Sequence, residues 1–116
     1  MLHGTHNAIE DARNENIIIS INGQFFKRNE AKISVFDSGY LVGDGIWEGF
    51  RLKKGKLIFI KEHLDRLWKS AKAVHMKFTF SKNELVQQVW DVLNENNMND
   101  GVHVRLMITR VIKKTP

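Results

Sequence analysis

The stretch "IWEGFRLKKGKLIFI", residues 46–60, contains the pattern that decides the fold. Two apolar runs flank a Lys-Lys-Gly segment, and glycine is a residue that tight turns between strands favour. The stretch therefore predicts a β-hairpin with strands at 46–54 and 56–60 around Gly55.

The first of these strands presents two different faces, because successive strand side chains point to opposite sides. Trp47, Gly49 and Arg51 share one face. The other face carries Ile46, Glu48, Phe50 and Leu52. A glycine inside a strand leaves a gap, so we expect a ligand or another backbone to approach at Gly49.

Upstream of this hairpin, the sequence predicts a second hairpin and a further strand. The runs "IIISI" (17–21) and "QFFKR" (24–28) flank Asn22-Gly23, a dipeptide that favours a turn in which both residues have positive φ. The alternating run "AKISV" (31–35) predicts a third strand. The glycine-rich "SGYLVGDG" that follows is interpreted as a structural turn. It lacks the Gly-Lys-Ser/Thr of a phosphate loop and precedes a strand instead of a helix.

Downstream of the hairpin, the pattern indicates two helices and a last strand. Residues 61–76 carry an apolar stripe at helical spacing. A second helix begins at Ser81, which forms a capping-box pattern with Glu84. The alternating run "VHVRLMIT" (102–109) predicts the last strand. The two stripes consist of Leu64, Leu67, Trp68, Ala71 and Val74, and of Leu85, Val86, Val89, Trp90 and Leu93.

The order of these elements, strands followed by two helices and a strand, predicts an α+β fold. We expect a mostly antiparallel sheet with two helices packed on one face. The 116 residues, of which 42% are hydrophobic and 27% charged, suit one globular domain. Residues 1–16 are polar and aperiodic and are interpreted as an N-terminal leader.

The composition excludes several classes of protein. The sequence has no cysteine, so it contains neither a disulfide framework nor a thiolate metal site. Its apolar runs are too short to cross a bilayer, and the N-terminus lacks a secretory signal, which together predict a cytoplasmic protein without a membrane partner. The net charge is +5, but the lysines are dispersed and no nucleic-acid-binding motif is present. We therefore expect no nucleic-acid partner, and a basic surface or a pocket for a small anion.

Some polar residues are candidate metal ligands. Asp37, Asp44 and Glu48 are close in sequence, but their spacing does not supply the dense oxygen cluster of a calcium loop. His3 and His6 lie in the leader, outside any ligand pattern. No metal site is predicted.

Arg66 lies early in the first helix, beside its apolar stripe. Its spacing alone favours an ion pair with a nearby acid. The alternative is a guanidinium that is held at the helix edge and grips a phosphate through several donors.

A second candidate site lies on the strands. His103 and Arg105 share one strand face. Together with Arg51 and Trp47 of the other strand, they would form a cationic, aromatic-walled pocket suited to a carboxylate. The alternative is a sheet surface with ordinary cross-strand pairs.

Three blocks of the sequence resemble the class IV aminotransferases, which are the fold-type IV pyridoxal-phosphate enzymes. The blocks are "FDSGYLVGDGIWEGFR" (36–51), "EHLDRLWKSA" (62–71) and "HVRLMITR" (103–110). The resemblance implies a small N-terminal α+β domain at residues 17–112 and the start of an interdomain linker at 113–116.

The resemblance also implies pyridoxal phosphate as cofactor and a second, larger domain that carries the catalytic lysine. No lysine of this chain matches that lysine. We therefore expect a truncated chain that contains no catalytic residue and is inactive alone, and a full-length protein that is an aminotransferase.

Carried over residue by residue, the resemblance assigns Arg66 to the cofactor phosphate. The matching substrate-binding positions are Trp47, Arg51, His103 and Arg105. Arg51 and Arg105 match a branched-chain type of enzyme, whereas His103 replaces a tyrosine. Val42 stands where branched-chain enzymes often have a tyrosine that reaches across the dimer.

The resemblance implies transfer of an amino group between an amino acid, with the branched-chain type favoured, and a 2-oxo acid. It also implies a homodimer or a higher homo-oligomer. D-Amino acid aminotransferase and aminodeoxychorismate lyase activities are the alternatives within the family. A non-catalytic binding module on the same scaffold is the alternative outside enzymes.

Overall fold

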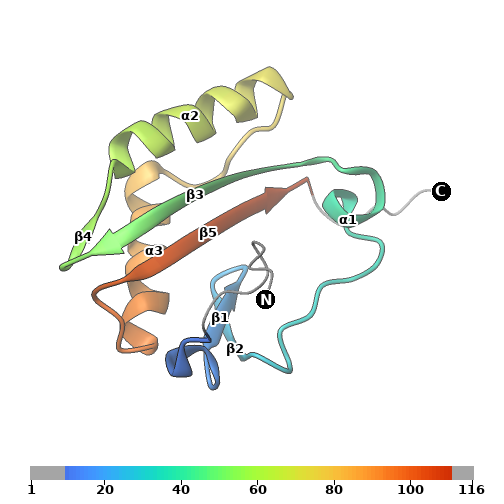
Figure 1. Ribbon diagram of the computed structural model, residues 1–116. Coiled ribbons are helices and arrows are strands. Elements are labelled where there is room, and N and C mark those ends of the chain that lie inside the picture. The colour runs from blue at the N-terminus through green and yellow to red at the C-terminus, as the bar shows by residue number, and fades with distance from the viewer. Residues whose placement is uncertain (1–9, 111–116) are drawn as a thin grey trace, which may run out of the picture.

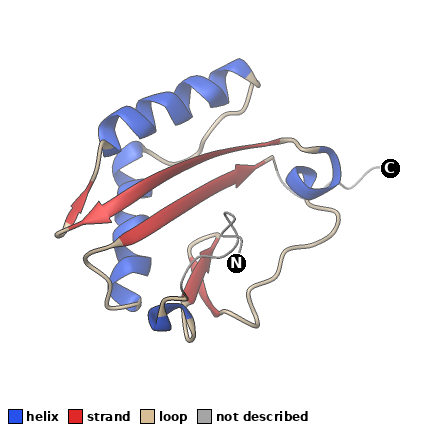
Figure 2. Cartoon of the chain, viewed as in Figure 1, coloured by secondary structure: helices blue, strands red, loops and turns tan. Residues whose placement is uncertain are grey.

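The computed structural model describes residues 10–110, and Figures 1 and 2 show their arrangement. His3, His6, most of the expected leader and the expected linker lie outside the described residues. In chain order, the elements are a 3-10 helix at Ala12–Asn14, β1 (Ile18–Ile21), β2 (Gln24–Lys27), α1 (Ser38–Val42), β3 (Gly45–Lys53), β4 (Lys56–Leu57), α2 (Ile60–Ala73), α3 (Lys82–Glu95) and β5 (Val102–Thr109).

The first hairpin forms as its turn sequence predicts. β1 and β2 pair antiparallel, and their register runs from Ile18 opposite Lys27 to Ile21 opposite Gln24. Asn22 has φ 54° and Gly23 has φ 78°, so both turn residues are left-handed. The predicted turn geometry is therefore confirmed.

A second, three-stranded antiparallel sheet has the strand order β4–β3–β5. β3 and β5 pair along eight residues, from Gly45 opposite Thr109 to Leu52 opposite Val102. β4 contains two residues, whereas the sequence predicted a strand to residue 60. The strand is short because Phe59 has φ 53°, which ends the extended backbone and leads directly into α2.

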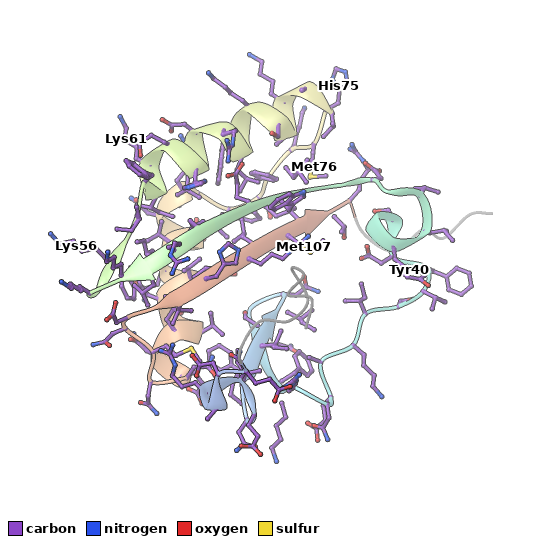
Figure 3. All side chains as sticks on the ribbon, viewed as in Figure 1. Tyr40, Lys56, Lys61, His75, Met76 and Met107 are labelled. Atoms are coloured by element: carbon purple, nitrogen blue, oxygen red, sulfur yellow. The ribbon has the colours of Figure 1, made fainter. Side chains whose placement is uncertain are left out.

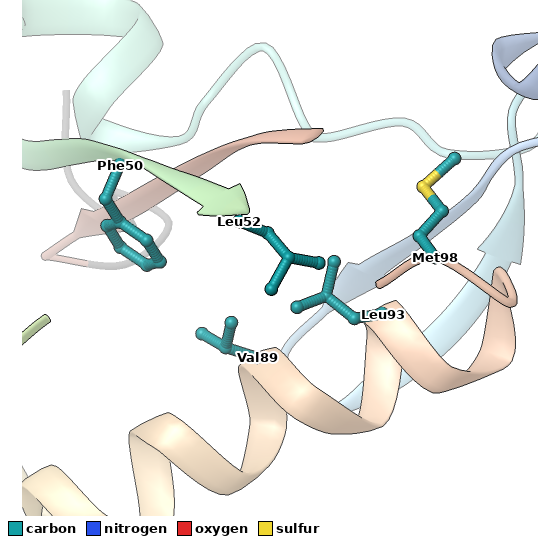
Figure 4. Close-up of a cluster of buried hydrophobic side chains, with 5 residues drawn as sticks. All are labelled: Phe50, Leu52, Val89, Leu93 and Met98. Atoms are coloured by element: carbon teal, nitrogen blue, oxygen red, sulfur yellow. The ribbon is translucent and has the colours of Figure 1, made fainter. Parts of the chain in front are cut away.

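The helices α2 and α3 pack on one face of this sheet, as predicted. In Figure 1, α2 runs along β3 and α3 crosses behind the strands. One core cluster joins the sheet to α3 and the turn that follows it, and consists of Phe50, Leu52, Val89, Leu93 and Met98 (Figure 4). A second cluster joins the two helices through Leu64, Leu67 and Leu85. The α+β fold is confirmed.

The capping box of α3 is also confirmed. The Ser81 hydroxyl accepts from the backbone N–H of Glu84 at 3.1 Å, and the Glu84 carboxylate accepts from that of Ser81 at 3.1 Å. α2 ends at Ala73, three residues earlier than predicted, so Val74 lies beyond the helix and is 40% exposed. Among residues 10–110, none of the helices has the length and apolar character needed to cross a bilayer.

The prediction of a strand at residues 31–35 is wrong. This segment has no strand in the structure, and its apolar side chains Ile33 and Val35 are 60% and 61% exposed. Alternation alone does not make a strand where the segment finds no sheet edge to pair with.

The glycine-rich segment contains a short helix, α1, which the sequence pattern did not predict. The Asp37 carboxylate caps it by accepting from Gly39 N at 2.8 Å, and Gly43 ends it at φ 70°. An aspartate before the helix and a glycine after it are ordinary start and stop signals, and here they bracket only five residues.

Candidate functional site

The face of the sheet opposite the helices carries the four residues predicted to bind substrate. The register places Arg51 opposite His103, Gly49 opposite Arg105 and Trp47 opposite Met107. Their side chains are exposed, and Met107 is labelled on β5 in Figure 3. The structure therefore brings these candidates together on one surface, which we call the outer sheet face: Trp47, Gly49, Arg51, His103, Arg105 and Met107.

Arg105 is held against Trp47. Its guanidinium carbon lies 4.8 Å from the centroid of the indole ring, within the range of a cation–π contact. Trp47 is 58% exposed, so this contact lies at the surface. A planar cation fixed on an aromatic ring can present its free N–H groups to an anion in a defined orientation.

The gap predicted at Gly49 is taken by His103. A Cβ built on Gly49 would lie 3.0 Å from both Cε1 and Nε2 of the imidazole. This is tighter than nine in ten real Cβ contacts, so a larger residue at position 49 would push the ring aside by a few tenths of an ångström. Neither a ligand nor another backbone is required to explain Gly49.

We expect Gly49→Ala to leave stability nearly unchanged in the parent chain. Alanine stabilises a strand interior over glycine by about 0.5–1 kcal/mol, and displacing the His103 ring offsets that gain. In a His103→Ala background, the same change should raise the free energy of unfolding by about 0.5–1 kcal/mol. Urea titrations of the parent, the two single variants and the double variant measure the coupling between the two positions. If Gly49→Ala changes stability equally with and without His103, the contact is contradicted.

On the opposite face of β3, Glu48 is a buried acid held by α2. Its side chain is 4% exposed. Arg66 donates to it twice, from Nε at 2.8 Å and from Nη2 at 2.7 Å, and His63 Nδ1 donates to it at 2.7 Å. A buried carboxylate is costly unless it is paired, and these three bonds satisfy it. The ion pair expected for Arg66 is therefore present.

The sequence pattern suggested Glu48 only as a candidate metal ligand. It did not predict that Glu48 holds the Arg66 guanidinium in place. The available signal was an acid on the strand face that is otherwise apolar. The hydrogen bond from Arg66, and secondarily that from His63, hold the pKa of Glu48 below its ordinary value, although burial acts in the opposite direction. The same bond raises the pKa of Arg66.

The ion pair with Glu48 engages only Nε and Nη2 of the Arg66 guanidinium. Its side chain is 67% exposed, and among residues 10–110 no partner binds Nη1. Glu48 thus fixes one edge of the guanidinium and leaves the rest open to solvent. A cation oriented in this way suits an oxyanion such as a phosphate.

The other acidic candidates have structural partners. Asp37 caps α1 and accepts from the Thr109 hydroxyl, while Asp44 accepts from Arg110. In the part of the chain that the structure describes, no group of three or more His, Asp or Glu side chains could hold a metal ion.

A surface hollow of about 670 Å³ lies away from these candidates, beside α2 and the loop that follows it. It is lined by Asp65, Trp68, Lys69, Ala71, Lys72, His75, Met76, Lys77, Phe78 and Lys82. None of the residues predicted to bind cofactor or substrate lines it. The candidate site therefore has two parts: the outer sheet face, which gathers Trp47, Arg51, His103 and Arg105, and the oriented Arg66 guanidinium on the helix side of β3.

Comparison with known families gives a match to the model for amino-transferase class IV over residues 45–115. The match includes Arg66 and the whole outer sheet face.

Individual relatives agree with this match. A Methanocaldococcus jannaschii protein, provisionally named a branched-chain-amino-acid aminotransferase, is 42% identical over 79% of this chain and 32% of its own length. A Staphylococcus epidermidis D-alanine aminotransferase is 39% identical over 75% of this chain and 31% of its own length. The chain thus spans about a third of the length of these two relatives.

A solved structure has the same fold. The T.th. branched-chain amino acid aminotransferase in complex with N-(5'-phosphopyridoxyl)-L-glutamate superposes with a TM-score of 0.75 at 27% identity. The superposition covers 87% of this chain and 35% of that one.

Proposed function

This chain belongs to the class IV aminotransferases, and on that basis we propose that it supplies the small domain of a pyridoxal-phosphate-dependent transaminase. The observation that carries the proposal is the Arg66 guanidinium, which Glu48 fixes along one edge while its side chain stays 67% exposed. Such a preformed cation binds a phosphate without first having to be ordered.

The residues present fit this cofactor. Arg66 would bind its phosphate, and Glu48 and His63 would hold Arg66 in place. The T.th. relative has a phosphopyridoxyl compound bound on the same fold. When bound, pyridoxal phosphate supplies the electron sink that amino-group transfer requires.

The outer sheet face would orient the amino acid. Arg51 and Arg105 are cations suited to a carboxylate, and the Arg105 guanidinium is already positioned by Trp47. Trp47 supplies an apolar wall, and His103 fills the space above Gly49. Together these groups would bind and orient the substrate and exclude water from the aromatic side.

We favour a branched-chain amino acid as donor. Arg51 matches the branched-chain pattern, and the M. jannaschii relative is 42% identical. A D-amino acid is the second candidate, because the S. epidermidis D-alanine aminotransferase is 39% identical. The lyase branch of the family stays an alternative within the same site.

We also propose a homodimer or higher homo-oligomer in the cytoplasm. The support for assembly is a segment of exposed apolar side chains, and Tyr40 projects from it away from the sheet (Figure 3). The members of this segment are Ile33, Val35, Phe36, Tyr40, Leu41 and Val42.

The test is a transaminase assay on the full-length protein with 2-oxoglutarate as acceptor. We expect L-leucine to be a donor at least about tenfold better than D-alanine in kcat/KM. The chain of 116 residues alone should give no turnover, because no lysine in it matches the catalytic one. Turnover by this chain alone would contradict the proposed division between domains, and faster use of D-alanine would favour the second candidate.

A further inference from the structure

The segment from Asp37 to Asp44 is hydrogen-bonded near both of its ends to Thr109 and Arg110, which follow each other at the end of β5. Near its start, Asp37 Oδ2 accepts from the Thr109 hydroxyl at 2.9 Å. At its end, Asp44 Oδ2 accepts from Arg110 Nε at 2.7 Å. In addition, the Arg110 backbone N–H donates to the hydroxyl of Ser38, which is 3% exposed, at 3.1 Å.

Arg110 also binds the end of α2. Its Nη1 donates to the carbonyl of His75 at 3.2 Å, and its Nη2 donates to the carbonyl of Val74 at 2.5 Å. The last carbonyls of a helix lack partners within the helix, and a cation at this end is favourable. One side chain therefore joins three parts of the chain: the end of β5, the 37–44 segment and the end of α2.

The packing around this junction is tight. A Cβ on Gly39 would overlap Thr109 Cγ2, and one on Gly45 would lie 3.2 Å from the carbonyl oxygen of Ile108. The 37–44 segment therefore lies directly against the end of β5.

We propose that Arg110 is a positioning residue that sets the 37–44 segment and α2 relative to the sheet. α2 carries Arg66, and the 37–44 segment leads within three residues to Trp47. Arg110 thereby links α2, which carries the proposed phosphate contact, to the segment that leads into β3, where Trp47 forms the aromatic wall. This consequence for catalysis rests on the proposed function, whereas the structural role of Arg110 does not.

Amide hydrogen exchange in the full-length protein, followed at residues of this domain, tests the structural role. The amides of Leu41, Gly43 and Asp44 donate within the segment, so they report its opening. In Arg110→Lys, which keeps the charge but cannot bind all three acceptors, we expect these amides to exchange at least about tenfold faster. The amides of α3 should keep their parent rates.

Arg13 provides a matched control. It also binds one carboxylate, that of Asp11, and two backbone carbonyls, those of Asp100 and Gly101. Arg13→Lys should leave the segment unchanged. Equal acceleration by both variants, or segment rates within about twofold of the parent in Arg110→Lys, would overturn the proposal. If Arg110→Lys does not fold, Asp44→Asn removes one arm of the junction and is expected to change the rates in the same direction.

Kinetics of the full-length enzyme test the consequence for catalysis. We expect Arg110→Lys to raise KM for the amino donor about tenfold and to change kcat less than about threefold, because substrate positioning is lost. Unchanged KM alongside accelerated exchange would show that Arg110 only stabilises the fold, and would overturn its positioning role. A parent enzyme without transaminase activity would refute the proposed function, while the exchange comparison would still decide whether Arg110 holds the segment.

Discussion

Replacing Glu48 with glutamine is expected to lower the free energy of unfolding by about 2–3 kcal/mol, since hydrogen bonds to charged groups contribute about 1.5–3 kcal/mol. Glu48 accepts from Arg66 twice and from His63 once, and its side chain is 4% exposed. Glutamine keeps one acceptor oxygen, but its N–H₂ group would face the Arg66 and His63 donors and could not accept from them. The exposed Arg66 regains water, which limits the loss. Urea titration measures the effect.

The control for this change is Glu62→Gln, which removes an exposed carboxylate from the first turn of α2. It should change stability by less than about 0.5 kcal/mol, as is usual for surface substitutions. Equal losses in the two variants would show that the Glu48 network contributes nothing specific.

The stability contribution of Glu48 should also depend on pH in a defined direction. Arg66 and then His63 hold the folded-state pKa of Glu48 below its ordinary value of 4.5. The contribution is therefore fully present above the unfolded-state pKa and is lost as pH falls through the folded-state pKa. We expect the stability difference between the parent and Glu48→Gln to shrink as pH falls below about 4.5. A difference that keeps its full size below that pH would contradict this assignment.

Replacing Arg66 with alanine in the full-length enzyme is expected to weaken pyridoxal phosphate binding by about 30-fold, the effect of losing charged hydrogen bonds to a phosphate. Arg66→Lys should lie between the parent and alanine, because lysine keeps the charge but loses the planar set of donors. Absorbance titration of the cofactor into the apoenzyme gives the dissociation constants.

Arg28→Ala is the matched control for Arg66. Arg28 is also exposed, and its guanidinium donates to the backbone carbonyl of Asn14 and not to a carboxylate. Its removal should leave the cofactor dissociation constant unchanged. An unchanged constant in Arg66→Ala would instead refute the assignment of Arg66 to the phosphate.

The elements that the sequence predicted correctly depend on local signals. Asn22-Gly23 specifies a left-handed turn without reference to distant residues, and Ser81 with Glu84 specifies a helix start within four residues. The alternation in β3 and β5 identified the outer sheet face, because one side of that sheet is buried by helices and the other is exposed.

Apart from α1, whose start and stop signals are local, the features that were missed depend on partners far away in the chain. The alternation at residues 31–35 is as regular as that of a strand, but no sheet edge accepts it. Glu48 and Arg66 are 18 residues apart, and only the packing of α2 on β3 shows that they bind each other. Arg110 binds Asp44, which is 66 residues away in the sequence, and Val74, which is 36 residues away. No local pattern can show such contacts.

The close approach of His103 to Gly49 also constrains how relatives of this chain can diverge. The imidazole lies only 3.0 Å from where a Cβ at position 49 would stand. A lineage that acquires a larger residue at position 49 is therefore expected to turn the ring at position 103 aside or to accept a smaller side chain there. The two positions are expected to change together, so this part of the outer sheet face would evolve as a pair of coupled sites and not one residue at a time.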